Sequence, residues 1–149
     1  MAHLRDRPCG ISNFLVDFGD GKSQSPAGGF SEVVFPPFEA QPTAVHDAVG
    51  TAVKPDAALP ASSNRLLLRR GFVGSLDLYV WWNEVRSGRV SKRRTVQVQL
   101  LSEDHETVVV TWRFREARPV SLSYSPLLAN QSGILVESTE FAFDRMEML

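Results

Sequence analysis

Hydrophobic and polar residues alternate along several short segments of this sequence, which is the pattern of β-strands with one buried face. In residues 13–18, Phe14, Val16 and Phe18 fall on one side of such a strand. A longer alternation runs through residues 108–115 and ends before Pro119, so we expect a break in the strand there. The same pattern predicts further strands at residues 30–35, 65–70, 96–100, 122–124 and 134–143.

Residues 75–87 instead follow the period of an amphipathic helix. Ser75 is placed to cap its N-terminus and Gly88 to end it. Asp77 in the first turn and Arg86 in the last turn complement the helix dipole. The apolar stripe consists of Leu78, Trp81, Trp82 and Val85. Since adjacent residues lie about 100° apart around a helix axis, we expect one tryptophan in the core and the other at an edge or interface.

These elements, about seven strands and one helix, predict a mainly β fold, either a small barrel or a sandwich with the helix laid against it. The chain has 149 residues, which fits one domain spanning residues 1–149. No internal repeat divides it.

The segment 38–64 differs from the rest because it is rich in Ala, Pro, Ser and Thr and has weak periodicity. Val45, Val49 and Val53 are spaced by four residues, but Gly50 and the flanking prolines argue against a helix. A loop this long is uncommon in a compact domain unless it has a function. Two interpretations stay open: a disordered insertion, or an arm that orders against a neighbouring subunit.

Charge is unevenly distributed although the formal net charge is only −1. Residues 65–94 contain eight basic and two acidic residues, a net charge of +6, whereas residues 128–149 contain one basic and four acidic residues, a net charge of −3. One interpretation is a solvated surface with chance clustering. The other is a pair of complementary faces that steer subunits together. No nucleic-acid-binding motif accompanies the basic cluster.

The sequence gives no basis for catalysis, a cofactor or a metal site. His3, His46 and His105 have no metal-ligand spacing, and phosphate-binding and nucleophile motifs are absent. The acidic residues around His105 are expected to form a solvated turn. Cys9 is the only cysteine, so an intrachain disulfide is excluded. The first ten residues are charged and no long apolar run occurs, so we expect synthesis in the cytoplasm without a signal peptide or membrane insertion.

Five stretches in order resemble the tail-tube proteins of contractile phages and contractile injection systems. The strand–turn–helix sequence of residues 68–82, Leu-Arg-Arg-Gly-Phe-Val-Gly-Ser-Leu-Asp-Leu-Tyr-Val-Trp-Trp, is the most specific of them. The resemblance implies two packed antiparallel sheets forming a barrel-like domain with one flanking helix. It also implies hexameric rings that stack into a hollow inner tube. The other four stretches are residues 13–18, 29–33, 112–120 and 137–143.

The resemblance also implies partners and contact residues. The partners would be further copies of the chain, contractile sheath subunits, baseplate or spike-hub proteins, and a lumen cargo or tape-measure protein, in a virion tail or injection particle. No sequence-specific nucleic acid is expected. The inter-ring and inter-subunit contacts are assigned to the arm, residues 38–64, and to the basic segment near residue 90. The candidate residues are Val45, His46, Val49, Val53, Arg89, Lys92, Arg93 and Arg94.

Two alternatives remain beside the repeating tube subunit. In the family the arm is a charged, strand-like hairpin, whereas here it is rich in Ala and Pro and barely charged. This departure favours a specialised layer, a tube-initiating adaptor next to the baseplate. An alternative of another class is a small β-barrel that binds an apolar ligand in its interior.

Overall fold

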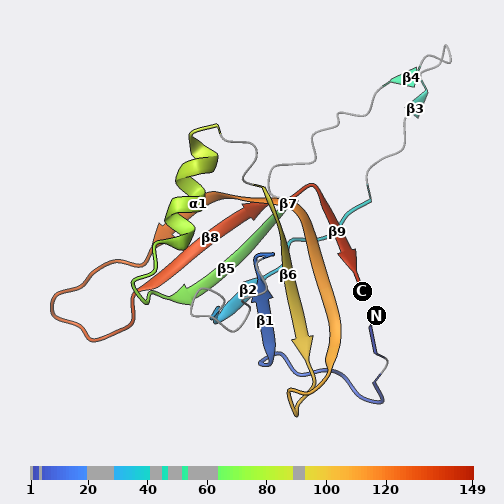
Figure 1. The fold of residues 1–149 in the computed structure, drawn as a ribbon, viewed down its shortest axis with the longest axis horizontal. Helices are drawn as coiled ribbons and strands as arrows, with labels where there is room; N and C mark the ends of the chain where they lie inside the picture. Colours follow the sequence, from blue (N-terminus) through green and yellow to red (C-terminus); the bar gives the residue numbers. More distant parts are fainter. Residues whose placement is uncertain are drawn as a thin grey trace.

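The computed structural model describes residues 2–3, 5–19, 29–40, 45–46, 52–53, 64–88 and 93–149. Within these ranges the chain forms nine strands and one helix (Figure 1). The N-terminal strands are β1 (Phe14–Asp17), β2 (Glu32–Val34), β3 (Val45–His46) and β4 (Ala52–Val53). They are followed by β5 (Arg65–Gly71), α1 (Asp77–Arg86), β6 (Arg94–Leu101), β7 (Val108–Tyr124), β8 (Val136–Ala142) and β9 (Arg145–Met148).

Seven of the strands form one antiparallel sheet in the order β1-β6-β7-β8-β5-β2, and β9 also pairs with β7. The prediction of a mainly β fold with one helix is confirmed. The sheet is continuous rather than divided in two, because β7 pairs with β6 and β9 in its first part and with β8 in its second part. The barrel is not closed, since β1 and β2 stand at the two ends of the strand order.

Strand β7 turns the corner between the two halves of the sheet (Figure 1). The expected break before Pro119 is wrong: residues 108–124 form one strand. Glu116 has a positive φ of 56°, and the register with β8 shifts between Pro119 and Ser121. Such a bulge lets a strand bend and twist without ending, and it also accommodates a proline that cannot donate to the ladder.

The core fills the space between the two halves of the sheet and α1. Trp81 is 1% exposed, and its ring centroid lies 5.3 Å from that of Phe141 and 5.7 Å from that of Phe18. Trp82 is only half-buried, and its ring is covered by the Arg86 guanidinium at 4.9 Å. The two tryptophans therefore divide as the helical spacing predicts. The other residues of the buried cluster include Val16, Phe30, Leu66, Leu68, Leu78, Val96, Val98, Phe114, Ala117 and Phe143.

The N-terminus of α1 lies one residue away from the predicted position, and its C-terminus ends as predicted. The helix starts at Asp77 with Leu76 in the capping position, one residue later than predicted. The Ser75 hydroxyl still accepts a hydrogen bond from the first-turn N–H of Asp77 at 3.4 Å, and it donates to the Asp77 carboxylate at 2.8 Å. Arg86 lies in the last turn as predicted, and Gly88 follows with a φ of 85°, the left-handed conformation that glycine adopts without strain.

Three short strands were not predicted. The tetrapeptide of β9, Arg-Met-Glu-Met, is too short for its alternation to be diagnostic, and it is held by pairing with residues 112–115 of β7. Strands β3 and β4 pair with each other inside the arm, with Val45 opposite Val53 and His46 opposite Ala52. Part of the arm is therefore a β-hairpin.

Candidate assembly surfaces

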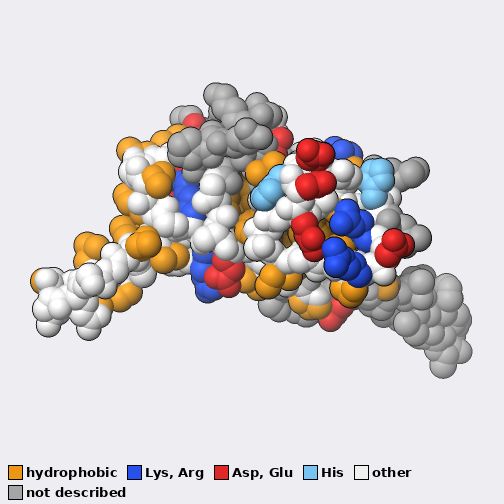
Figure 2. Space-filling view, turned by 90° about the horizontal axis from the view of Figure 1, so that it is seen from below, with side chains coloured by type: hydrophobic (Ala, Val, Ile, Leu, Met, Phe, Trp, Pro, Cys, Tyr) orange, Lys and Arg blue, Asp and Glu red, His pale blue; other side chains and the backbone are white. Residues whose placement is uncertain are grey.

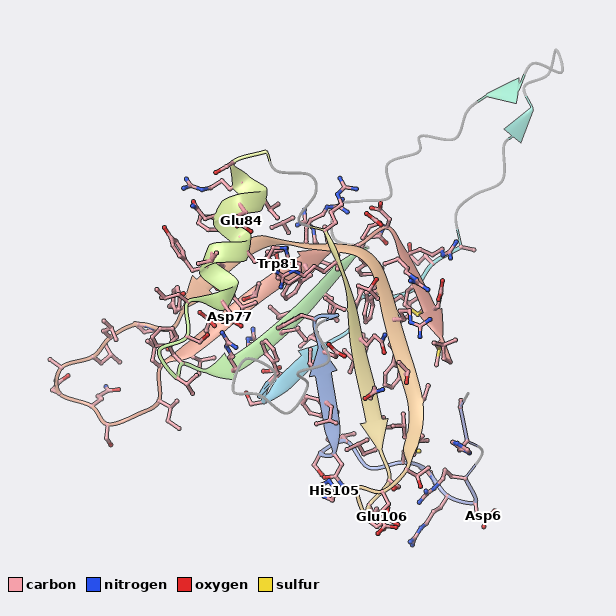
Figure 3. All side chains as sticks on the ribbon, in the orientation of Figure 1. Asp6, Asp77, Trp81, Glu84, His105 and Glu106 are labelled. Carbon is pink, nitrogen blue, oxygen red and sulfur yellow. The ribbon has the colours of Figure 1, made fainter. Side chains whose placement is uncertain are left out.

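A buried ion cluster joins the N-terminus of α1 to the sheet. Arg70, at the end of β5, donates from Nε to Oε1 of Glu137 at 2.9 Å and from Nη2 to Oδ1 of Asp77 at 2.5 Å. The side chains of Arg70 and Glu137 are each only 1% exposed. Glu137 also accepts a hydrogen bond from the Tyr124 hydroxyl at 2.8 Å. Asp77 lies at the end of α1 nearest this cluster (Figure 3). The Arg70 guanidinium therefore has a carboxylate on two sides.

Ion pairing shifts the pKa values of Arg70 and Asp77 so that both groups stay charged. Burial alone would raise the pKa of Asp77, but hydrogen bonds from Arg70 and Ser75 outweigh it and hold the pKa below its usual value. Burial alone would lower the pKa of Arg70, and its bonds to the carboxylates of Asp77 and Glu137 raise it instead. Burial and the bond to Glu137 raise the pKa of Tyr124 to about 12. General acid–base catalysis at neutral pH needs a pKa near neutrality, which neither Asp77 nor Tyr124 has.

The cluster changes the interpretation of the two charged segments. Arg70 belongs to the basic segment and Glu137 to the acidic one, yet they pair inside a single subunit and do not reach the surface. Other members of the two segments also pair within the chain. Asp144 contacts Arg118 at 2.8 Å and Arg93 at 3.5 Å. On the face seen in Figure 2, acidic and basic side chains are interspersed rather than gathered into two fields of opposite sign.

The eight predicted contact residues fall into three groups: exposed residues next to β6, residues on the β3–β4 hairpin, and residues outside the described ranges. Arg93 and Arg94 are exposed at the start of β6; Arg93 faces Asp144, and the Arg94 guanidinium lies 4.6 Å from the centroid of the Trp81 ring. In the arm, three of the four candidates lie on the paired strands β3 and β4. Their contacts with other subunits stay predictions. Val49, Arg89 and Lys92 lie outside the described residues.

An apolar groove runs along the seam where the barrel fails to close. It has a volume of about 480 Å³ and lies between β1 and β2, the two ends of the strand order. Cys9 and the 92% exposed Ile11 also border it. Sequence reasoning missed the groove, because only the arrangement of the sheet reveals which strand edges face each other. Its apolar lining includes Phe14, Val33, Phe35, Val98, Leu100 and Trp112.

A second apolar feature is the loop between β7 and β8, residues 125–135, here called the β7–β8 knob. Leu127 is 85% exposed, Ile134 is 79% exposed and Leu128 is 51% exposed. The knob contains no charged residue, and Figure 2 shows it as a protrusion of hydrophobic and uncharged side chains at the left of the molecule. The Pro-Leu-Leu run at residues 126–128 could have indicated an exposed apolar loop, because polar residues are usual in turns.

The described residues contain no group of three or more His, Cys, Asp or Glu side chains that could hold a metal ion. Nor is any helix among them long and apolar enough to cross a bilayer.

Comparison with known proteins gives these surfaces a context. A family model described as T4-like virus tail tube protein gp19 matches residues 12–147. The chain belongs to this tail tube family. No curated protein matches the sequence.

Solved structures agree with the tail tube family. A chain of the PVC extracellular contractile injection system, in its sheath–tube complex in the extended state, is 25% identical with a TM-score of 0.72 over 97% of this chain and 93% of that chain. A chain of the anti-feeding prophage tube-terminating cap is 22% identical with a TM-score of 0.72, over 100% and 95% respectively. Hcp1 from Flavobacterium johnsoniae is 18% identical with a TM-score of 0.55, over 91% and 94%. The last two similarities establish the fold alone.

Proposed function

We propose that this tail tube subunit assembles as hexameric rings that stack into a hollow inner tube within a contractile sheath. The observation that carries the proposal is the match of the tail tube family to nearly the whole chain, residues 12–147. The similarity to a chain of the PVC sheath–tube complex supports the sheath as a partner.

The fold is suited to this role because the sheet leaves strand edges open. Within the described residues, β1 pairs only with β6 and β2 only with β5. An open edge is a template for pairing with another chain, and closure into a ring removes it. The function is then mechanical: a stiff tube is driven forward when the sheath shortens, and the lumen carries cargo. The subunit contributes stiffness and shape rather than catalysis.

A specialised layer of the tube is the second candidate. A chain of the anti-feeding prophage baseplate is 20% identical with a TM-score of 0.63, and a chain of the PVC sheath/tube terminator is 25% identical with a TM-score of 0.72. The same fold therefore also occurs in structures of a sheath/tube terminator and of a baseplate. The weakly charged arm favours such a role for this chain.

Negative-stain electron microscopy of the purified protein, combined with its mass by light scattering, tests the proposal. Rods of uniform width support the repeating tube subunit, and single rings of six copies support the adaptor. A protein that stays monomeric at every concentration, and that also fails to extend preformed baseplates of its own system, contradicts both.

A further inference from the structure

The β7–β8 knob and the seam groove are two apolar surfaces that the described part of the subunit leaves uncovered. Monomeric proteins rarely expose adjacent large aliphatic side chains to this extent, and exposed apolar patches usually mark interaction sites. Leu127 and Ile134 are each more than three-quarters exposed. The groove is bounded by β1 and β2, which also carry open backbone edges.

The knob has a fixed base. Ser125 and Val136 exchange two hydrogen bonds across it, from the Ser125 N–H to the Val136 carbonyl at 2.9 Å and from the Val136 N–H to the Ser125 hydroxyl at 2.9 Å. Ile134 also packs close to Gly71, since a Cβ added at that glycine would lie 3.3 Å from the Ile134 side chain. A surface held in its bound shape loses less conformational entropy on association.

The knob and the groove are compatible in charge, and the groove is large enough to take up apolar side chains. The knob has no charged residue, and the groove has one, Glu32, which is already paired with Arg69 at 3.0 Å. No unpaired charge would therefore be buried by a contact between them, which is the condition for an apolar contact to be favourable. A groove of about 480 Å³ is within the size range of sites that take up several apolar groups.

We propose that the β7–β8 knob of one subunit inserts into the seam groove of the next copy in the same ring. The inference rests on the proposed function. Knob and groove lie on different parts of one chain, so the contact is heterologous, and a heterologous contact gives a ring when the rotation between successive copies closes. The occupant of the groove is thus a second copy of this chain.

A mixing experiment tests this contact with residues whose substitution leaves the fold intact. Leu127→Asp places a charge on the knob, and Ile11→Asp places a charge at the border of the groove. Both side chains are at least 85% exposed, so the circular dichroism spectrum of each variant is expected to match that of the unmodified protein. Each variant alone is expected to associate at least about tenfold more weakly than the unmodified protein. Mixed together, they retain one intact knob and one intact groove and are expected to form 1:1 heterodimers that do not extend.

Cross-linking of intact assemblies is the second measurement, because a single isolated contact is weaker than a closed ring. The native Cys9 borders the groove and is exposed. A short bismaleimide is expected to link Leu127→Cys to Cys9 of the adjacent copy and to give a ladder of covalent multimers. Leu76→Cys, at the exposed residue just before α1, is the matched control, and Cys9→Ser in the Leu127→Cys background is expected to abolish the ladder.

The outcomes separate the inference from the proposed function. Unmodified protein that forms rings or rods, with both aspartate variants assembling equally well, overturns the knob–groove contact alone. So does a Leu127→Cys assembly that gives no more cross-linked multimer than Leu76→Cys. If the aspartate variants still form single rings but no rods, the contact lies between rings and its assignment within the ring is wrong. Unmodified protein that never multimerises, together with a Leu127→Cys variant that gives no cross-link, contradicts both the function and the contact.

Discussion

Arg70 is the residue on which the polar contacts between α1 and the sheet converge. It binds carboxylates from two different elements, the buried Glu137 on β8 and the partly exposed Asp77 on α1. Burying the charges of Arg70 and Glu137 is costly, and the cost is offset only while every partner is present. The cluster therefore fixes where the helix sits rather than adding much net stability.

Removal of one partner of this cluster is expected to be severe. Glu137→Gln should lower the free energy of unfolding by about 3–5 kcal/mol, because the Arg70 guanidinium keeps only Asp77 as a charged partner in a buried site. Urea denaturation followed by circular dichroism measures the change. Glu140→Gln, on the opposite face of the same strand, is the matched control with an expected change under about 0.5 kcal/mol. Equal effects of the two variants would contradict the role assigned to the cluster.

Tyr124 makes stability depend on pH in the alkaline range. Its pKa is raised in the folded protein to about 12, above the value of about 10 expected in the unfolded chain. The folded state thus holds the phenol proton more tightly, so stability is unaffected below about pH 10 and is lost as the pH rises from about 10 to about 12.

Tyr124→Phe should remove this part of the alkaline loss, as measured by urea midpoints across that pH range. The sequence has one other tyrosine, Tyr79, on the exposed face of α1. Tyr79→Phe leaves the bond between Tyr124 and Glu137 in place, so the loss is expected to persist. A Tyr124→Phe variant that loses stability as steeply as the unmodified protein would show that other groups cause the dependence.

The two neighbouring tryptophans on α1, Trp81 and Trp82, should differ sharply in their contribution to the free energy of unfolding. Trp81→Ala empties a site at the centre of the core and is expected to cost about 3–5 kcal/mol of unfolding free energy. Trp82→Ala removes a half-buried ring that mainly contacts Arg86 and Tyr79, and should cost about 1 kcal/mol or less. Thermal or urea denaturation of the two variants measures the difference. A larger loss for Trp82→Ala would mean that the helix packs on its other face.

Among the elements, the β3–β4 hairpin of the arm is expected to be separable from the rest of the domain. The hydrogen-bonded partner of β3 is β4, and the seven-stranded sheet does not include either strand. We therefore expect deletion of residues 45–54 to leave a folded subunit that no longer extends tubes. Circular dichroism checks the fold and electron microscopy checks tube growth. Unfolding of the deletion variant would show that the arm is part of the domain, and normal tubes would remove it from the inter-ring contact.

Strand β7 shows how one element joins the parts of the fold. Its bulge between Pro119 and Ser121 lets it serve both halves of the sheet, so the core is enclosed by a single bent sheet. The same bend brings the end strands β1 and β2 to the two sides of the seam groove, where they do not pair with each other. The open edges and the groove thus follow from one structural feature, the failure of a seven-stranded sheet to close.

In the whole molecule, several of the charges that looked opposed in sequence are paired within the subunit. Arg93 and Arg118 both contact Asp144, and Arg70 contacts Glu137, so these charges are partly neutralised before any neighbour binds. We therefore expect tube yield, measured by pelleting, to change less than about twofold between about 50 and about 500 mM salt, since apolar contacts are insensitive to screening. Dissolution of tubes at the higher salt concentration would restore the interpretation in which charged faces hold the subunits together.

The elements with strong periodicity, and the family, follow from the amino-acid sequence alone. The alternation in residues 13–18 and the helical spacing of Leu78 and Trp81 show which side of each segment is buried. This information lies in the order of apolar and polar residues within the segment itself. The order of the five family-like stretches was enough to predict a tail tube subunit, in agreement with the family match over residues 12–147.

Which charges are internal and which apolar residues lie outside depends on how distant segments pack together. Arg70 and Glu137 are 67 positions apart, and their pairing depends on β5 lying beside β8 in a particular register. The seam groove depends in the same way on where the sheet ends, and β9 on pairing with β7. These features arise from contacts between distant segments, and the hydrophobic pattern of one segment carries no information about its partner.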